Sequence, residues 1–215
     1  ASFGGNIYEQ GHSDFGYENF MTLLVADPDL ATYYMDKLAD NWIRQLEKWL
    51  PAVRDYVQIV QVGDDLGMQT GPQISPKMYR ELIKPFHAKV YQYIKDNSDL
   101  SIFLHSCGSI YEFLPDLIEI GVDIINPVQY GAADMDPVRL KREFGKHLTF
   151  WGGGCDTQHV LTRGSIPEIK KEVEEMVSIF APGGGFVFTQ VHNIQSDISP
   201  EKIIALYETA YELGH

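Results

Sequence analysis

The sequence has few cysteines, few basic residues and no long apolar segment, and each shortage excludes a class of protein. Two cysteines, Cys107 and Cys155, are too few for a disulfide scaffold in 215 residues, so we expect free thiols in a reducing compartment. The 17 Lys and Arg residues against 30 Asp and Glu give a net charge of −13, which argues against nucleic acid or an anionic membrane as partner. The sequence also lacks an apolar run of transmembrane length and a signal-peptide core, which indicates a soluble, cytoplasmic protein.

What the sequence does contain is a repeated alternation of strand and helix patterns. Short apolar runs rich in β-branched or aromatic residues are typical of buried parallel strands. They occupy residues 57–62, 100–104, 123–127, 148–151 and 185–189. Capping and proline signals predict helices over 17–50 with a break at Asp27-Pro28, from Ser75 with a kink at Pro85, and over 111–120, 136–145, 167–180 and from Ser199.

Five consecutive strand–helix units predict an α/β fold with a parallel sheet and right-handed crossovers. Both an open doubly wound sheet and a (β/α)8 TIM barrel have this pattern. No Gly-x-Gly-x-x-Gly turn follows a strand, so a dinucleotide-binding fold has no support. A full barrel typically takes about 250 residues, and the chain has five clear strands plus a sixth candidate near its amino end. We therefore expect residues 1–215 to form a single domain, a partial TIM barrel that lacks the first barrel units.

A partial barrel exposes strand edges and apolar inner surface, and such edges pair readily with other chains. If these 215 residues are the complete chain, we expect a homo-oligomer that covers the edges.

Metal-capable and polar side chains follow the predicted strands, at the ends where barrels of this type place their active sites. Strand 100–104 runs into His105 and Cys107, which are two residues apart and can point the same way on an extended segment. Imidazole nitrogen and thiolate sulfur together suit zinc better than magnesium or calcium. The other strand ends carry Asp64, Asp65, Gln129, Tyr130, Cys155, Asp156, Gln190, His192 and Asn193. Two histidines and two cysteines on one rim predict a metal site, although packing alone would explain any one of them.

The other polar residues at the strand ends are assigned only to general roles in catalysis or binding. Asp64, Asp65 and His192 are the catalytic candidates, and Gln129, Gly153, Asp156 and Asn193 are the candidates for binding substrate or cofactor. Glycines 152–154 would let backbone approach a ligand, although a tight turn explains them equally well. The other histidines are interpreted as surface or core residues with no special role: His12, His87, His147, His159 and His215.

The motif His105-Ser106-Cys107-Gly108 and the segments 118–127, 190–195 and 199–203 resemble the uroporphyrinogen decarboxylase superfamily. This superfamily includes corrinoid-dependent methyltransferases, and the resemblance covers nearly all 215 residues. It implies a (β/α)8 barrel whose members begin well before Ala1, so that this chain corresponds to the carboxyl-terminal two-thirds of a uroporphyrinogen decarboxylase-like barrel.

The methyltransferase branch of the superfamily holds zinc on a His-x-Cys pair and a later cysteine. The resemblance therefore implies His105 and Cys107 as ligands. His192 occupies the loop where the branch has its later cysteine, and Cys155 offers a second thiolate, so both are candidates for the third ligand. The implied function is zinc-assisted methyl transfer between a corrinoid, carried by a partner protein, and a small donor or acceptor. Asp64, Asp65 and Gln129 would then position substrate or orient the ligands.

Two alternatives stay open. One is tetrapyrrole decarboxylation without metal, in which an aspartate orients the pyrrole nitrogens and arginines near the amino terminus hold the carboxylates. The segment Gly63-Asp64-Asp65-Leu66-Gly67 resembles a loop of that branch that bears an aspartate. The other is a corrinoid- or tetrapyrrole-binding fragment without catalysis. Metal content separates the methyltransferase from both.

Overall fold

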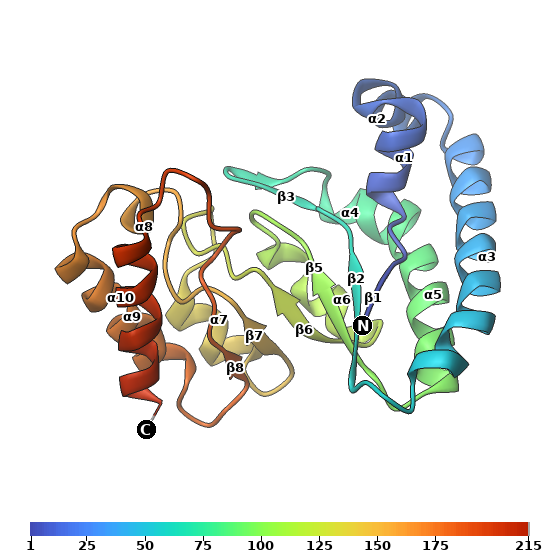
Figure 1. Cartoon of the computed structure of the whole chain (residues 1–215). Coiled ribbons are helices and arrows are strands. Elements are labelled where there is room, and N and C mark those ends of the chain that lie inside the picture. The colour runs from blue at the N-terminus through green and yellow to red at the C-terminus, as the bar shows by residue number, and fades with distance from the viewer. Residues whose placement is uncertain (215) are drawn as a thin grey trace.

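The computed structural model describes residues 1–214, and their six main strands form one parallel sheet in the order β1-β2-β5-β6-β7-β8 (Figure 1). The predicted partial TIM barrel is confirmed, with its five strands adjacent in sequence order and β1 as the sixth. The strands are β1 (Ser2–Gly4), β2 (Ile59–Gly63), β5 (Ser101–His105), β6 (Val122–Asn126), β7 (Thr149–Trp151) and β8 (Phe186–Val187), and a separate antiparallel hairpin pairs β3 (Gly67–Met68) with β4 (Gly71–Pro72).

Helices flank the curved sheet, with α1, α2, α3 and α5 toward its β1–β2 edge and α8, α9 and α10 toward its β7–β8 edge (Figure 1). None of the helices within residues 1–214 is both long and apolar enough to cross a bilayer. His215 lies outside the described residues. The helices are α1 (Tyr8–Phe15), α2 (Tyr17–Ala26), α3 (Pro28–Val53), α4 (Pro76–Met78), η1 (Tyr79–Ile83), α5 (Lys84–Asn97), η2 (Tyr111–Phe113), α6 (Leu114–Glu119), α7 (Pro137–Phe144), α8 (Val160–Arg163), α9 (Ile166–Phe180) and α10 (Pro200–Leu213).

Local sequence signals explain where the long helices begin and where one is irregular. The break expected at Asp27-Pro28 is present, because α3 starts at Pro28 and the Asp27 carboxylate accepts the Leu30 N–H at 3.1 Å. Just before Pro85 the helix widens into the π-helical turn η1. The sequence predicted a kink at Pro85, and the structure has this π-helical turn before it, because a wider turn tolerates a residue that has no N–H to donate.

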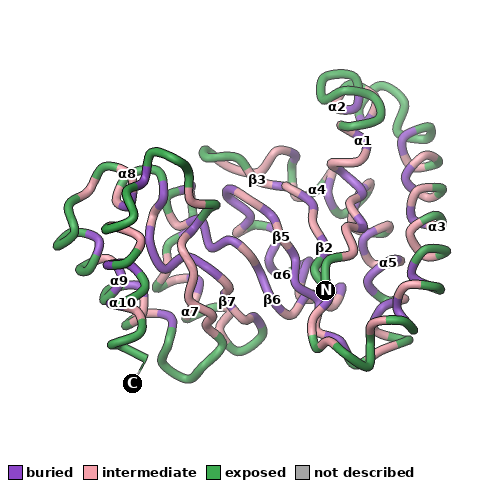
Figure 2. The backbone as a smooth tube through the Cα atoms, viewed as in Figure 1, coloured by how far each residue is buried: buried purple, intermediate pink, exposed green. Residues whose placement is uncertain are grey.

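The two faces of the sheet differ in how well they are covered. Along β2, Val60 and Val62 are buried in the main core, whereas Gln61 between them is exposed. Figure 2 shows the central strands mostly buried and the outer helix surfaces exposed. On the inner face, a cavity of about 600 Å³ is lined in part by Gln61, Phe103 and Trp151. The inner face is therefore partly open, as in an incomplete barrel.

Candidate metal centre and adjoining cavity

The carboxyl ends of β2 and β5 bring three metal-capable side chains together. Asp65, His105 and Cys107 each offer one ligand atom, and these three atoms lie within 4.8 Å of one another. His105 Nε2 is 3.6 Å from Cys107 Sγ and 4.0 Å from Asp65 Oδ1. The register of the two strands explains the meeting, because Gly63 pairs with His105 and Asp65 follows two residues later. The three residues are called the Asp65–His105–Cys107 group below.

A chain of hydrogen bonds sets the orientation of the His105 ring. The Asn126 side-chain N–H donates to the Trp151 carbonyl at 2.9 Å, which turns the Asn126 carbonyl oxygen toward His105. His105 Nδ1 lies 2.7 Å from that oxygen, so Nδ1 carries the proton and donates it. Nε2 therefore keeps its lone pair, and it faces Cys107 and Asp65. Metal-ligating histidines are usually oriented in this way by a partner of the other ring nitrogen.

The loops that carry Asp65 and Cys107 pack backbone against backbone. Asp65 Oδ1 accepts the Cys107 N–H at 2.7 Å, and the Gln129 side-chain oxygen accepts the Gly108 N–H at 2.8 Å. Gly108 has a φ of +81°, and a Cβ there would lie 2.5 Å from the carbonyl carbon of Gly67. Only glycine permits this approach and this backbone conformation, so the motif glycine holds the two loops together.

The charges around Cys107 are of the kind that a cation would balance. Burial, followed by the Asp65 carboxylate, raises the pKa of the Cys107 thiol to about 12. The Glu9 carboxylate of α1 adds to this effect. Burial and then the carboxylates of Asp64 and Asp65 raise the pKa of Glu9 itself. A coordinating metal ion reverses such an upward shift, because metal-bound thiols are deprotonated. Glu9 was not singled out from the sequence, since it lies more than 50 residues before the strand ends it faces.

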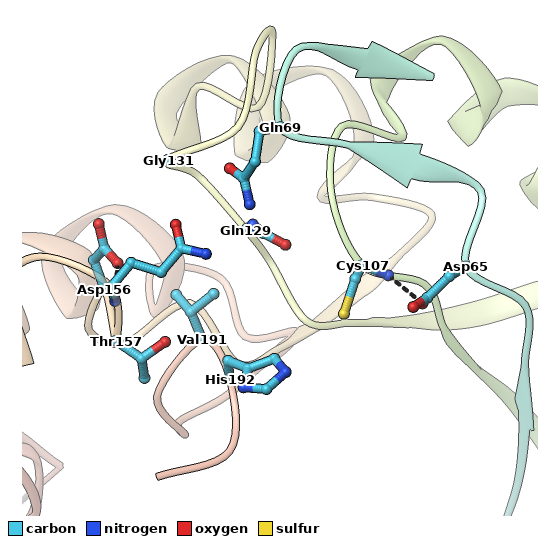
Figure 3. A pocket seen from close by; sticks show the side chains of 10 residues that line it. Asp65, Gln69, Cys107, Gln129, Gly131, Asp156, Thr157, Val191 and His192 are labelled. Atoms are coloured by element: carbon cyan, nitrogen blue, oxygen red, sulfur yellow. Dashed lines mark hydrogen bonds between the residues drawn. The ribbon is translucent and has the colours of Figure 1, made fainter. Parts of the chain in front are cut away.

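A cavity of about 270 Å³ adjoins the Asp65–His105–Cys107 group. Figure 3 shows Asp65 and Cys107 on one side, Asp156 and Thr157 on the other, and the amides of Gln69 and Gln129 between them. The cavity brings together five residues predicted from the sequence and five that were not singled out. These lining residues are Asp65, Cys107, Gln129, Asp156 and His192, and Gln69, Gly131, Thr157, Gln158 and Val191.

Asp64, a catalytic candidate from the sequence, does not line this cavity and is fully buried. One of its oxygens accepts the N–H groups of Ile7 and Tyr8, and the other accepts that of Glu9, at 2.6–2.8 Å. Its carboxylate also lies 2.7 Å from Nε2 of the buried His87. These contacts cap the amino end of α1 and tie it to β2 and α5, which is a structural arrangement.

Neither residue that the sequence offered as third ligand belongs to the Asp65–His105–Cys107 group. Cys155 is fully buried and its Sγ lies 3.0 Å from Glu172 Oε2, because its side chain packs into the smaller core under α9. Burial, then this carboxylate, raises the pKa of the Cys155 thiol. His192 lines the cavity but lies outside the group. Among residues 1–214, the third ligand atom of the group comes from Asp65.

Two of the expected binding residues also lie outside the 270 Å³ cavity. Gly153 has a φ of +80°, and a Cβ there would lie 2.8 Å from that of Val128, so it serves close packing of the loop after β7. Asn193 lines a neighbouring surface cavity together with His192 and Gln158.

The fold and the site define an α/β partial-barrel protein with a thiol, an imidazole and a carboxylate grouped at its strand ends. The chain matches the uroporphyrinogen decarboxylase (URO-D) family over residues 7–213 and belongs to that family. This is an enzyme family, and the resemblance noted from the sequence is confirmed.

The relatives with names include a decarboxylase, a methionine synthase and a methyltransferase. The chain is 24% identical over 208 residues to uroporphyrinogen decarboxylase of Shewanella amazonensis, covering 94% of this chain and 54% of that protein. It is 25% identical over 150 residues to methionine synthase of Methanocaldococcus jannaschii, covering 68% of this chain and 44% of that protein. A methyltransferase from Methanosarcina mazei has the same fold, with a TM-score of 0.67 and 17% identity over 92% of this chain and 54% of the other. The chain thus spans about half the length of the curated relatives it matches.

Proposed function

We propose that this chain carries the zinc site of a methyltransferase, which moves a methyl group between a corrinoid on a partner protein and a small donor or acceptor. The observation that carries the proposal is the Asp65–His105–Cys107 group, in which the His105 Nε2 lone pair faces both the thiol and the carboxylate. Membership of the URO-D family and the fold shared with a methyltransferase support it.

The donor set fits zinc. Zinc binds cysteine sulfur, histidine nitrogen and carboxylate oxygen, whereas magnesium and calcium prefer oxygen alone. The Asn126 oxygen that accepts from His105 Nδ1 supplies the second contact that such a ligand usually has. Catalytic zinc sites with three protein ligands keep one position for substrate. The cavity beside Cys107 provides room for it.

Each residue has a distinct part in the proposed reaction. Zinc supplies Lewis acidity, which lowers the pKa of an acceptor thiol or polarises the atom that bears the methyl group. Asn126 orients His105, and Gly108 with Gln129 holds the Cys107 turn. The Gln69 and Gln129 amides bind polar atoms of the substrate. His192 Nδ1 lies 3.4 Å from the Asn193 carbonyl oxygen, to which it can donate its proton. Its Nε2 then has a free lone pair and accepts the proton of the acceptor thiol. Asp64 does not contact the substrate; it accepts the N–H groups of Ile7 and Tyr8 and so stabilises the amino end of α1.

Metal-free tetrapyrrole decarboxylation is the second candidate, and the relatives named uroporphyrinogen decarboxylase favour it. That reaction needs cations for the substrate carboxylates. The Asp65–His105–Cys107 group has no part in a metal-free reaction, so methyl transfer suits the residues present better.

Methylcobalamin and 2-mercaptoethanol test the proposal, with zinc supplied and cob(I)alamin followed by its absorbance. The thiol proton passes to His192 or to solvent, the thiol sulfur takes the methyl group, and the electron pair of the broken Co–C bond stays on cobalt. We expect the rate above background to be lost in Cys107→Ser and His105→Ala. Cys155→Ser is the matched control and should keep the rate, because Cys155 is buried against Glu172 away from the group. A rate that Cys107→Ser leaves unchanged would contradict the proposal.

A further inference from the structure

The cavity beside the Asp65–His105–Cys107 group has an unusual balance of charge. Two carboxylates, Asp65 and Asp156, line it, and no lysine or arginine does among the described residues. Three glutamines, Gln69, Gln129 and Gln158, also line it. An anionic ligand would therefore face the Asp65 and Asp156 carboxylates on opposite sides of this cavity (Figure 3).

Zinc would cancel only part of this negative charge. The two positive charges of the ion balance the Asp65 carboxylate and the Cys107 thiolate, and His105 is a neutral ligand. Asp156, on the opposite side, keeps its charge. Its side chain is only 15% exposed, and it is held by the Gln158 N–H at 2.7 Å and by His159 Nδ1 at 2.8 Å. The carboxylate is thus fixed at the cavity wall and has further lone pairs available for a ligand.

A second, uncharged feature lies between the carboxylates. Gln129 is 9% exposed, and its side-chain oxygen is used by the Gly108 N–H. Its side-chain nitrogen has no hydrogen-bond partner among residues 1–214, and the residue lines the cavity. This largely buried residue therefore presents an unpaired N–H donor to the cavity, which matches an acceptor atom on a ligand.

We infer that the substrate of this site is a small molecule with a positively charged group, held by Asp156, and a hydrogen-bond acceptor, held by the Gln129 amide. The inference rests on the proposed function for its reaction, and it predicts that anionic molecules bind this cavity more weakly than cationic ones. Asp156 is the residue that sets this specificity.

Three probes of nearly equal size test the charge preference directly. They are 2-methoxyethylamine, which is cationic, 2-methoxyethanol, which is neutral, and methoxyacetate, which is anionic, and all three carry an ether oxygen as acceptor. Dissociation constants are measured by NMR chemical-shift titration of the zinc-supplemented chain at pH 8, where imidazoles are ordinarily uncharged. We expect the amine to bind at least about ten-fold more tightly than methoxyacetate, with the alcohol between them.

Variants separate Asp156 from the general negative charge of the chain. Asp156→Asn should reduce the preference for the amine over the alcohol about ten-fold, whereas Asp55→Asn, at a side chain that is 79% exposed, should leave it unchanged. Methoxyacetate binding as tightly as the amine, no saturation by any probe at 100 mM, or equal effects of the two variants would each overturn the inference. If Asp156→Asn does not fold, the order in which the unmodified chain binds the three probes decides whether the cavity prefers a cation.

Zinc content, measured on the same samples, keeps this inference distinct from the proposed function. If zinc is bound and the cavity prefers anions, the inferred substrate charge is wrong and the proposed function stands. If no zinc is bound and the cavity prefers cations, the proposed function is wrong and the charge preference stands.

Discussion

Replacing Asp64 by asparagine tests whether this carboxylate stabilises the fold or takes part in the chemistry. Asp64 is fully buried and accepts from three backbone N–H groups and from His87. An asparagine side chain has nearly the same shape, but it has one acceptor oxygen and an N–H2 group in place of the other. At least one of these buried donors must then face another donor.

The magnitude follows from the number and kind of hydrogen bonds that the substitution weakens or removes. Hydrogen bonds to a charged group contribute about 1.5–3 kcal/mol each, and the substitution removes at least one such bond and weakens the others. We expect the free energy of unfolding to fall by about 3–5 kcal/mol. At roughly 2–4 °C per kcal/mol for a chain of this size, the melting temperature should fall by roughly 6–20 °C.

Urea unfolding followed by circular dichroism measures the effect. Asp65→Asn is the matched control, because the Asp65 side chain is 35% exposed and accepts one backbone N–H, so its stability loss should stay below about 1.5 kcal/mol. The two variants should differ in the other direction for zinc content. Asp64→Asn should keep its zinc below its melting temperature, and Asp65→Asn should contain less zinc. An unfolding free energy within about 1 kcal/mol of wild type in Asp64→Asn would refute the anchoring role.

Three further predictions concern the group and its cavity. Gly108→Ala should lower zinc affinity by at least about ten-fold in a chelator competition, because its Cβ would meet Gly67; Gly183→Ala, with a similar φ and no atom within 4 Å, should leave zinc affinity unchanged. Asn126→Ala should weaken zinc binding by roughly 10–100-fold, because His105 loses the acceptor of its Nδ1–H. A zinc affinity equal to that of wild type would show that Asn126 does not orient His105. His192→Ala should retain zinc but slow methyl transfer by about 100-fold or more, and loss of zinc instead would make His192 a ligand.

The strand order could be predicted from the sequence because the signals for it are local. Each predicted strand is a short run of β-branched and aromatic residues between turn residues, and the crossover rule then orders the strands. The break at Asp27-Pro28 and the irregularity at Pro85 follow equally from single residues. The helix α1 was not predicted, because its amino end depends on Asp64, more than 50 residues further along the chain.

The candidate site was predictable only in part, because side-chain direction at a strand end depends on long-range packing. Asp64 and Asp65 are neighbours, and successive side chains of an extended segment point to opposite sides, so the sequence cannot tell which one faces Cys107. The structure turns Asp65 toward Cys107 and buries Asp64. Cys155 likewise follows a strand, but its side chain packs against Glu172, which lies on a helix 17 residues later.

Elemental analysis of the protein, purified without chelator or added metal, shows whether the Asp65–His105–Cys107 group is a zinc site. We expect about one zinc per chain in the unmodified protein and in Cys155→Ser, and loss of that zinc in Cys107→Ser, His105→Ala and Asp65→Ala. A protein without zinc that also fails to bind added zinc would contradict this expectation. So would zinc that survives all three ligand substitutions.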